Sequence, residues 1–122
     1  MLKFVVDTSS GIRFSKSEII NEKIERLRLD ILACMRVCQI ELENRKNGID
    51  GESTIEQLEE WIVPDLTNML KIVENKKIPK ERKDRWLESF ANAFRGWEWH
   101  EPTELYTRLT NIHHDYQNIY PK

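Results

Sequence analysis

One uninterrupted stretch constrains the fold of this chain more than any other feature. No proline or glycine occurs between residues 17 and 46. Apolar side chains recur in this stretch at spacings of three and four, which is one face of an α-helix. They are Ile20, Ile24, Leu27, Ile31, Cys34, Cys38 and Leu42. A helix of this length would be about 45 Å long, and it can bury such a stripe only against other helices that run beside it.

Capping patterns predict where the first two helices begin and end. Ser15 and Glu18 have the spacing of a capping box, and the run N-G-I-D-G at 47–51 ends the first helix. Ser53 and Glu56 have the same spacing, so a second helix is expected at about 54–75. Its predicted apolar face consists of Ile55, Leu58, Trp61, Ile62, Leu66, Met69, Leu70 and Val73.

Prolines mark the rest of the second half. Pro64 lies inside the second helix, where its ring predicts a kink near 60–63. Pro79 suits the first position of a third helix at about 80–95, and Pro102 that of a fourth at about 103–119. The third helix would bury Trp86, Phe90, Phe94 and Trp97, and the fourth Leu105, Leu109, Ile112, Tyr116 and Ile119.

These segments predict an all-α chain that forms one domain over residues 1–122. Four amphipathic helices, at about 17–46, 54–75, 80–95 and 103–119, are joined by short loops and therefore favour a four-helix up-down bundle. Residues 1–15 are expected to form an extended arm or a short hairpin, with D-T-S-S-G at 7–11 as its turn.

Composition narrows the classes of function. A net charge of −2 with interspersed acids and bases gives no basic stripe, so direct nucleic-acid binding has no electrostatic support. The sequence shows neither the apolar core of a signal peptide nor a membrane span, so a cytoplasmic protein is expected. Cys34 and Cys38 are interpreted as reduced, buried thiols, and we expect no cofactor.

An aromatic, acidic corner lies between the third and fourth expected helices. Trp99 falls outside the apolar stripe of its neighbours. Aromatic side chains rimmed by charge are typical of binding hot spots. The residues predicted to bind a partner are Glu98, Trp99, His100, Glu101 and Glu104. The structural alternative is that Trp99 folds back onto the end of the bundle.

Two Arg/His pairs offer a catalytic alternative. Arg95 and His100, and likewise Arg108 and His113, are separated by four residues. This spacing resembles the active-site motif of HEPN ribonucleases, in which arginine and histidine act on RNA within a dimer. His113 and the adjacent His114 would point about 100° apart on a helix, which argues against one shared metal ion. Neither a metal site nor a catalytic residue is assigned from the sequence.

Residues 53–120 carry a second resemblance. Its motifs are T-I-E-Q-L-E-E-W-I-V-P-D-L-T-N-M-L, then N-K-K-I-P-K-E-R-K-D-R-W-L-E-S-F, then W-E-W-H-E-P-T-E-L and the closing Y-Q-N-I. The chain resembles the small helical immunity proteins encoded beside bacterial polymorphic, contact-dependent toxins. That resemblance implies bacterial competition, with a protein that binds and blocks the C-terminal domain of its cognate toxin.

Three hypotheses follow. The first is a non-enzymatic immunity protein, an antitoxin that binds a toxin domain through the acidic corner, and a basic nuclease is the toxin class that the acids would suit. The second is an Arg/His ribonuclease. The third is a structural or regulatory bundle that forms a homodimer through its own helix faces.

Overall fold

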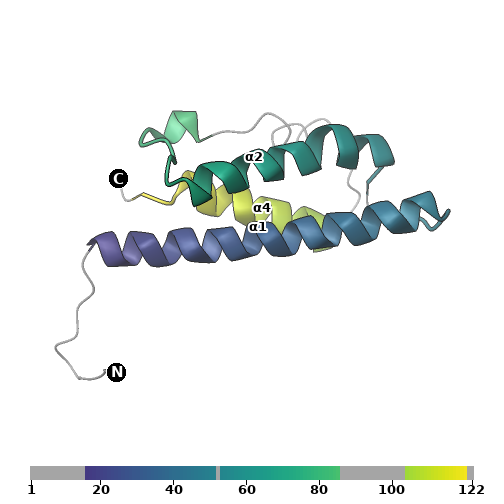
Figure 1. Ribbon diagram of the computed structural model, residues 1–122, viewed down its shortest axis with the longest axis horizontal. Coiled ribbons are helices and arrows are strands. Elements are labelled where there is room, and N and C mark those ends of the chain that lie inside the picture. Colours follow the sequence, from purple (N-terminus) through teal and green to yellow (C-terminus); the bar gives the residue numbers. More distant parts are fainter. Residues whose placement is uncertain (1–15, 52, 86–103, 121–122) are drawn as a thin grey trace, which may run out of the picture.

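The computed structural model describes residues 16–51, 53–85 and 104–120, and these residues contain helices and no strand (Figure 1). The prediction of an all-α chain is confirmed for them. The predicted arm or hairpin at 1–15 lies outside the described residues. The elements are α1 (Lys16–Lys46), the π-helical η2 (Gln57–Ile62), α2 (Val63–Glu74), the 3₁₀ turn η3 (Arg82–Asp84) and α4 (Glu104–Gln117).

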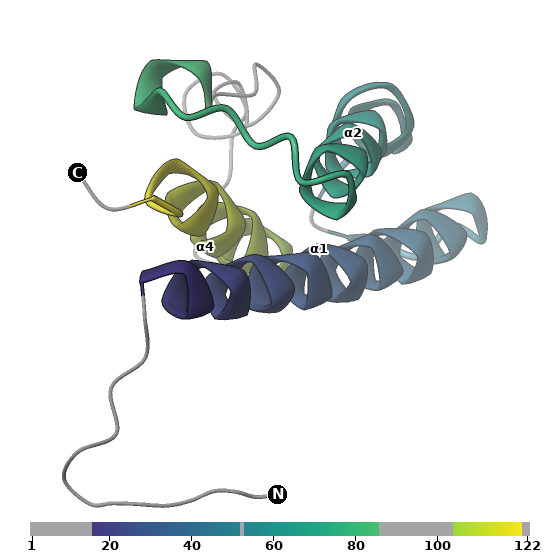
Figure 2. The same ribbon diagram turned by 60° about the vertical axis from the view of Figure 1, so that its left-hand side comes forward.

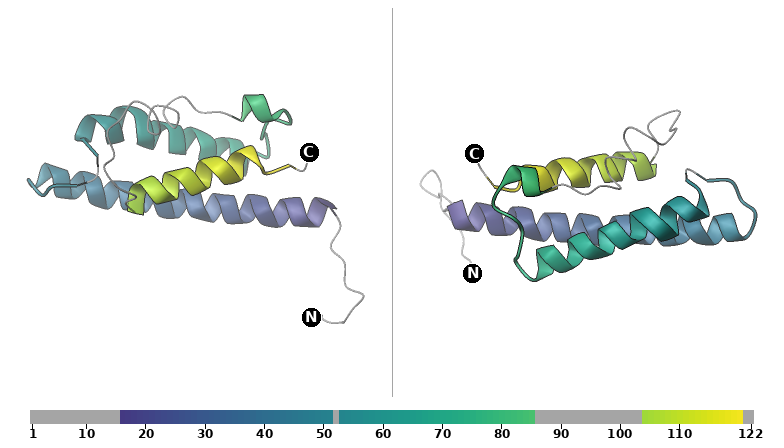
Figure 3. Two further views of the ribbon diagram at one scale, coloured as in Figure 1. Left: turned by 180° about the vertical axis from the view of Figure 1, so that it is seen from behind. Right: turned by 90° about the horizontal axis from the view of Figure 1, so that it is seen from above.

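The long helix α1 is the base of the fold. Both α2 and α4 lie along the same side of it, as Figure 2 and the two views of Figure 3 show. The core fills the space between the three helices, and α1 contributes Leu27, Ile31, Cys34 and Cys38 to it. The side chains that α2 and α4 add are Leu66, Met69, Val73, Leu105, Leu109, Ile112 and Tyr116.

The second helix begins one residue later than its predicted capping box implies. The Thr54 amide donates to Oε1 of Gln57 at 2.9 Å, and the Gln57 amide donates to Oγ1 of Thr54 at 3.0 Å. The capping box is therefore Thr54 with Gln57, and the predicted pair of Ser53 with Glu56 is wrong. Ser53 is instead buried, and its carbonyl accepts from Nε of Arg45 at 2.7 Å.

Pro64 acts at the place where the sequence predicts an irregularity. The helix is π-helical over Gln57–Ile62, and the Val63 amide donates to the Leu58 carbonyl, five residues back. The chain keeps helical dihedral angles through Ile62 and Val63. A wider turn directly before a proline gives the ring room beside the preceding carbonyls, so the helix continues through it.

The expected helix at 80–95 does not begin at Pro79, and the predicted four-helix bundle is not confirmed. Glu81 is extended, only Arg82–Asp84 form a 3₁₀ turn, and Arg85 leaves the helical region. Residues 86–95 lie outside the described part. The physical reason is Arg85, whose Nη1 donates to the carbonyls of Pro79 and Lys80 at 2.9 and 2.8 Å. Those carbonyls would otherwise accept the first hydrogen bonds of the helix.

The same guanidinium closes the end of α4. Nε and Nη2 of Arg85 both donate to the Gln117 carbonyl, at 3.0 and 2.7 Å. Arg85 is only 3% exposed, and its guanidinium lies 5.4 Å from the centroid of the Tyr120 ring. Because the carboxyl end of a helix is electronegative and its last carbonyls lack partners, a buried cation is favoured there. We refer to these contacts as the Arg85 clamp.

Both α1 and α2 end in the same hydrogen-bond pattern with different residues. After α1, the Ile49 amide donates to the carbonyl of residue 44, and Gly48 takes a φ of +80°. After α2, the Lys77 amide donates to the carbonyl of residue 72, and Lys76 takes a φ of +55°. Each is a Schellman motif, in which glycine is favoured because a Cβ strains the left-handed backbone.

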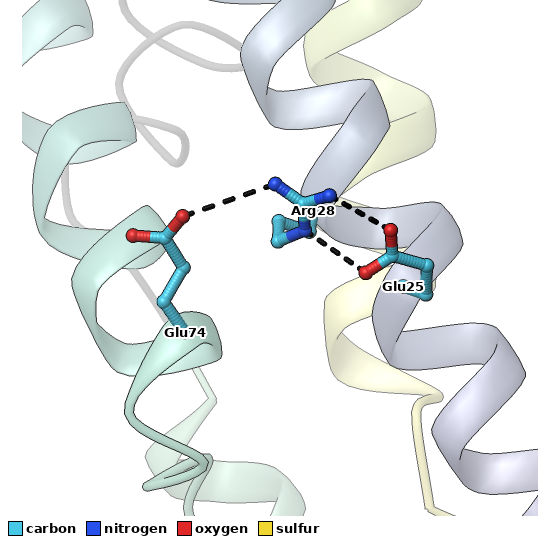
Figure 4. Close-up of polar contacts among 3 residues, drawn as sticks. All are labelled: Glu25, Arg28 and Glu74. Atoms are coloured by element: carbon cyan, nitrogen blue, oxygen red, sulfur yellow. Dashed lines mark hydrogen bonds and ion pairs between the residues drawn. The ribbon is translucent and has the colours of Figure 1, made fainter.

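A surface ion-pair group joins α1 to α2 (Figure 4). Arg28 donates through Nε and Nη2 to the two carboxylate oxygens of Glu25, at 2.9 and 2.7 Å. Its Nη1 lies 3.9 Å from the carboxylate of Glu74 on α2. The hydrogen bond from Arg28 lowers the pKa of Glu25 below its usual value. The group orients side chains at the surface and adds little to the free energy of folding.

Removal of the Arg85 clamp should unfold the protein at lower denaturant concentrations. We expect Arg85→Ala to lower the free energy of unfolding by about 3–5 kcal/mol, because three carbonyls lose their donor. Urea unfolding followed by circular dichroism measures this. The control is Arg82→Ala, since Arg82 is exposed and its loss should cost less than about 0.5 kcal/mol. Equal costs for the two variants would contradict the assignment.

The two helix ends provide a reciprocal pair of variants. Lys76→Gly should raise the free energy of unfolding by about 0.5–1 kcal/mol, because glycine removes the strain of a positive φ. Gly48→Lys should lower it by about 1 kcal/mol for the converse reason. Thermal and urea unfolding of both variants test this. A loss of stability in Lys76→Gly would mean that the lysine side chain contributes more than its backbone costs.

Candidate protein-binding surface

Of the predicted partner-binding residues, the structure describes one. Glu104 lies in the first turn of α4, where its carboxylate accepts from Nε of Arg108 at 3.2 Å and lies 3.1 Å from Nη2. Its side chain is exposed. The other four, Glu98, Trp99, His100 and Glu101, lie outside the described residues, so the proposed aromatic corner stays a prediction.

The Arg108 and His113 pair does not converge within one chain. Five residues along a helix correspond to a rotation of roughly 140°, so the two side chains leave opposite flanks of α4. Arg108 is already paired with Glu104. His113 is half-buried, and burial, with a smaller effect from His114, lowers the pKa of its imidazole. The other pair, Arg95 and His100, lies outside the described part.

The other described residues that could act as nucleophiles or metal ligands lie in surroundings that give them no such role. Cys34 and Cys38 are buried on the core face of α1 and form no disulfide. His114 is exposed and lies 3.6 Å from the Asp115 carboxylate. Among the residues that the structure describes, no three His, Cys, Asp or Glu side chains gather as metal ligands, and no helix has the length and apolarity of a membrane span.

An exposed tryptophan is the feature that sequence periodicity missed. Trp61, predicted to face the core, is 41% exposed, whereas Leu58 and Ile62 in the same π-helical segment are fully buried. A π-helical turn holds more residues than the 3.6 of an α-helix. Each residue of a π-helical turn therefore rotates less about the helix axis than in an α-helix. Three residues after the buried Leu58, Trp61 has not yet returned to the buried face. Pro64, three residues later, is the signal that could have indicated this.

Three acidic residues closely precede Trp61 in the chain. Glu56, Glu59 and Glu60 are all exposed, and only Glu59 has a described ion pair, with Nζ of Lys46 at 3.2 Å. We call Glu56, Glu59, Glu60 and Trp61 the Trp61 surface. A large aromatic ring with a charged rim is the composition found at the energetic centre of protein interfaces.

The Trp61 surface and Glu104 lie toward the same end of the molecule. In Figures 1 and 3, η2 lies beside the last part of α1, and α4 begins in the same half of the molecule but short of the end of α1. An open hollow of about 380 Å³ beside η2 is lined by Arg45, Thr54, Ile55 and Glu56. This end therefore presents carboxylates from two separate parts of the chain together with an exposed indole.

A second cleft has a different character. It measures about 240 Å³ and separates the N-terminal half of α1 from the C-terminal half of α4. Lys23 and Arg26 line one side, and His114 and Asp115 line the other. Arg26 is largely exposed and is paired with Glu22 on its own helix at 3.4 Å. Exposed side chains of this kind suit a hydrated hollow better than a built binding site.

No known protein family, curated protein or solved structure matches this chain.

The pKa of His113 predicts how stability changes with pH. The imidazole binds fewer protons in the folded state than in the unfolded state, because folding lowers its pKa below 6.5. Stability from this residue is therefore present above pH 6.5 and is lost as the pH falls toward the lowered value. We expect His113→Asn to flatten this part of the stability curve, measured by urea unfolding between pH 5 and pH 8. An unchanged slope would assign the pH dependence to other groups.

Proposed function

We propose that this protein is an immunity protein, which binds and neutralises a cognate bacterial toxin domain by stoichiometric protein–protein interaction. The observation that carries the proposal is the exposed Trp61 within an acidic rim. The same segment, E-Q-L-E-E-W-I-V-P at 56–64, is part of the resemblance to immunity proteins. In this proposal the protein acts without catalysis, in the cytoplasm of the toxin-producing cell.

The local structure favours tight binding because the surface is held rigid. Leu58 and Ile62 anchor η2 in the core, and the capping box of Thr54 and Gln57 closes its first turn. A segment whose backbone is already held in place loses little conformational entropy when a partner covers it. The indole can therefore contribute most of its buried area to affinity.

The charges around Trp61 favour a basic partner. Glu56 and Glu60 are exposed and have no ion pair with any other described residue, so both remain available to the lysines and arginines of a partner. Such charges accelerate association more than they increase final affinity. A nuclease toxin, whose surface must attract nucleic acid, is the class that these acids suit best.

The predicted corner at 98–104 enters the proposal as a second part of the same interface. Glu104 lies toward the same end of the molecule as η2. A toxin domain that covers this end would meet Trp61 and Glu104 together. Trp99, Glu98, His100 and Glu101 remain predicted contacts.

The test begins with the toxin domain that the proposal predicts to be encoded beside this protein, expressed together with it and purified as a complex. Trp61→Ala should raise the dissociation constant at least about 30-fold, since a central tryptophan contributes roughly 2 kcal/mol or more. Isothermal titration calorimetry measures the change. Ile19→Ala is the matched control, because Ile19 is an exposed apolar residue at the other end of α1.

Charge variants test the acidic rim separately. Glu56→Gln with Glu60→Gln should slow association and weaken its dependence on salt, with a smaller change in the dissociation rate. Full affinity in Trp61→Ala would contradict this surface while leaving an inhibitor that binds elsewhere. Absence of any complex with the adjacent toxin would contradict the proposed function itself.

A further inference from the structure

The outer side of α1 carries a second row of apolar side chains. Leu29, Leu32 and Ile40 are 52%, 39% and 55% exposed, and they lie opposite the buried row on the same helix. Figure 2 shows that α2 and α4 both pack on the other side of α1. No described segment covers this outer row.

Leu29 and Leu32 of this row belong to a series of positions with the period of a coiled-coil seam, and Ile40 lies next to that series. Positions along it follow each other at alternating steps of three and four, which is the 3.5-residue repeat that lets two helices pack along their length. The seam consists of Glu18, Glu22, Glu25, Leu29, Leu32, Arg36, Gln39 and Glu43. Its apolar centre is thus bounded by an acid on one side and a base on the other.

The four central positions of the seam, Glu25, Leu29, Leu32 and Arg36, are self-complementary when a second copy runs antiparallel. With the two-fold axis between residues 30 and 31, Leu29 faces Leu32 of the partner subunit. In the next layer outward, Glu25 faces Arg36 of the partner subunit, and the symmetry repeats this pair on the other side. A parallel pairing would instead bring each Glu25 and each Arg36 against its own mate, which charge repulsion disfavours.

We propose that the outer face of α1 binds a second copy of this chain as an antiparallel helix pair. Leu29 and Leu32 form the apolar centre, and two symmetric pairs of Glu25 with Arg36 fix the direction and the register. The proposal concerns a face other than the Trp61 surface and does not depend on toxin binding.

The side chains at the seam are prepared for this contact. Figure 4 shows the Glu25 carboxylate held by two hydrogen bonds from Arg28, which is itself tied toward Glu74 on α2. The carboxylate is therefore ordered before a partner arrives, and it remains exposed. Arg36 is exposed and makes no ion pair with another described residue, so its guanidinium is available to a partner carboxylate.

Because only one helix of each subunit forms the contact, the proposed dimer should be weak. The apolar centre spans only a few turns of α1, so the buried area falls at the small end of specific interfaces. Such a dimer should dissociate with a constant on the order of 10–100 μM. It would be populated at high local concentration and not in a dilute solution.

Sedimentation equilibrium of the full chain, over protein concentrations from about 10 μM to about 1 mM, tests the proposal. Glu25→Arg and Arg36→Glu should each raise the dimer dissociation constant at least about tenfold, because like charges then meet twice across the axis. The double variant Glu25→Arg/Arg36→Glu restores both pairs and should return to within about threefold of the natural chain.

The matched control is Glu22→Arg, which reverses one charge on the same seam and also loses an intrahelical ion pair, with Arg26. Since Glu22 would face Gln39 of the partner subunit, the control should change the constant less than about threefold. Equal effects of Glu22→Arg and Glu25→Arg, or no recovery in the double variant, would overturn the proposed register. A chain that stays monomeric at all these concentrations would overturn the proposed dimer. Leu29→Asp would then identify what covers the face: a loss of stability would indicate a segment of the same chain, and a loss of toxin affinity would indicate the toxin.

Discussion

The buried guanidinium of Arg85 is the contact on which the second half of the fold depends. It joins two stretches that are far apart in sequence, the loop after α2 and the last carbonyl of α4. Without it, the carbonyls of Pro79, Lys80 and Gln117 would lose their donor away from water. Burying these carbonyls without a hydrogen-bond donor would lower the free energy of unfolding. This explains why arginine, whose guanidinium has five rigidly placed donors, occupies this position. Ile78 and Tyr120 pack beside it, and the Tyr120 hydroxyl donates to the Ile78 carbonyl at 3.4 Å.

At the other end of the molecule, one local irregularity decides which side chain is presented. A regular α-helix through Gln57–Ile62 would keep Trp61 close to the buried face, whereas the π-helical turn before Pro64 rotates it outward. The residues that anchor the helix, Leu58 and Ile62, thus fix the backbone from which the exposed indole projects. Backbone geometry and the proposed binding role are connected here through a single proline.

Periodicity predicted the long elements well, because their signal is local. The bounds of α1 and α4 lie within two residues of those expected from their apolar spacing. The helix expected after Pro79 does not begin there, since the competing partner of its first carbonyls is Arg85, which also binds Gln117, 32 residues further along the chain. No pattern within a short window contains such a contact.

The candidate surfaces likewise divide into features with a local sequence signal and features that depend on the packing of distant segments. The exposure of Trp61 depends on a turn that is not 3.6-periodic, so a stripe drawn at spacings of three and four misplaced it. Leu29 and Leu32 on the outer side of α1 were not singled out from the sequence, and only the packing of α2 and α4 determines which side of this helix is buried. Glu104 lies in the first turn of the last helix, where the helix dipole favours a carboxylate, and its predicted role in partner binding stays a prediction.

The positions of the two cysteines on α1 make them natural probes of how the core opens. Cys34 and Cys38 have no exposed surface and lie on the one side of α1 that both other helices cover. A thiol reagent can reach them only when α1 separates from α2 or α4, because thiolate chemistry requires access to the sulfur. The rate at which a thiol reagent modifies them therefore reports how often the core between these helices opens, and the measurement needs no added label.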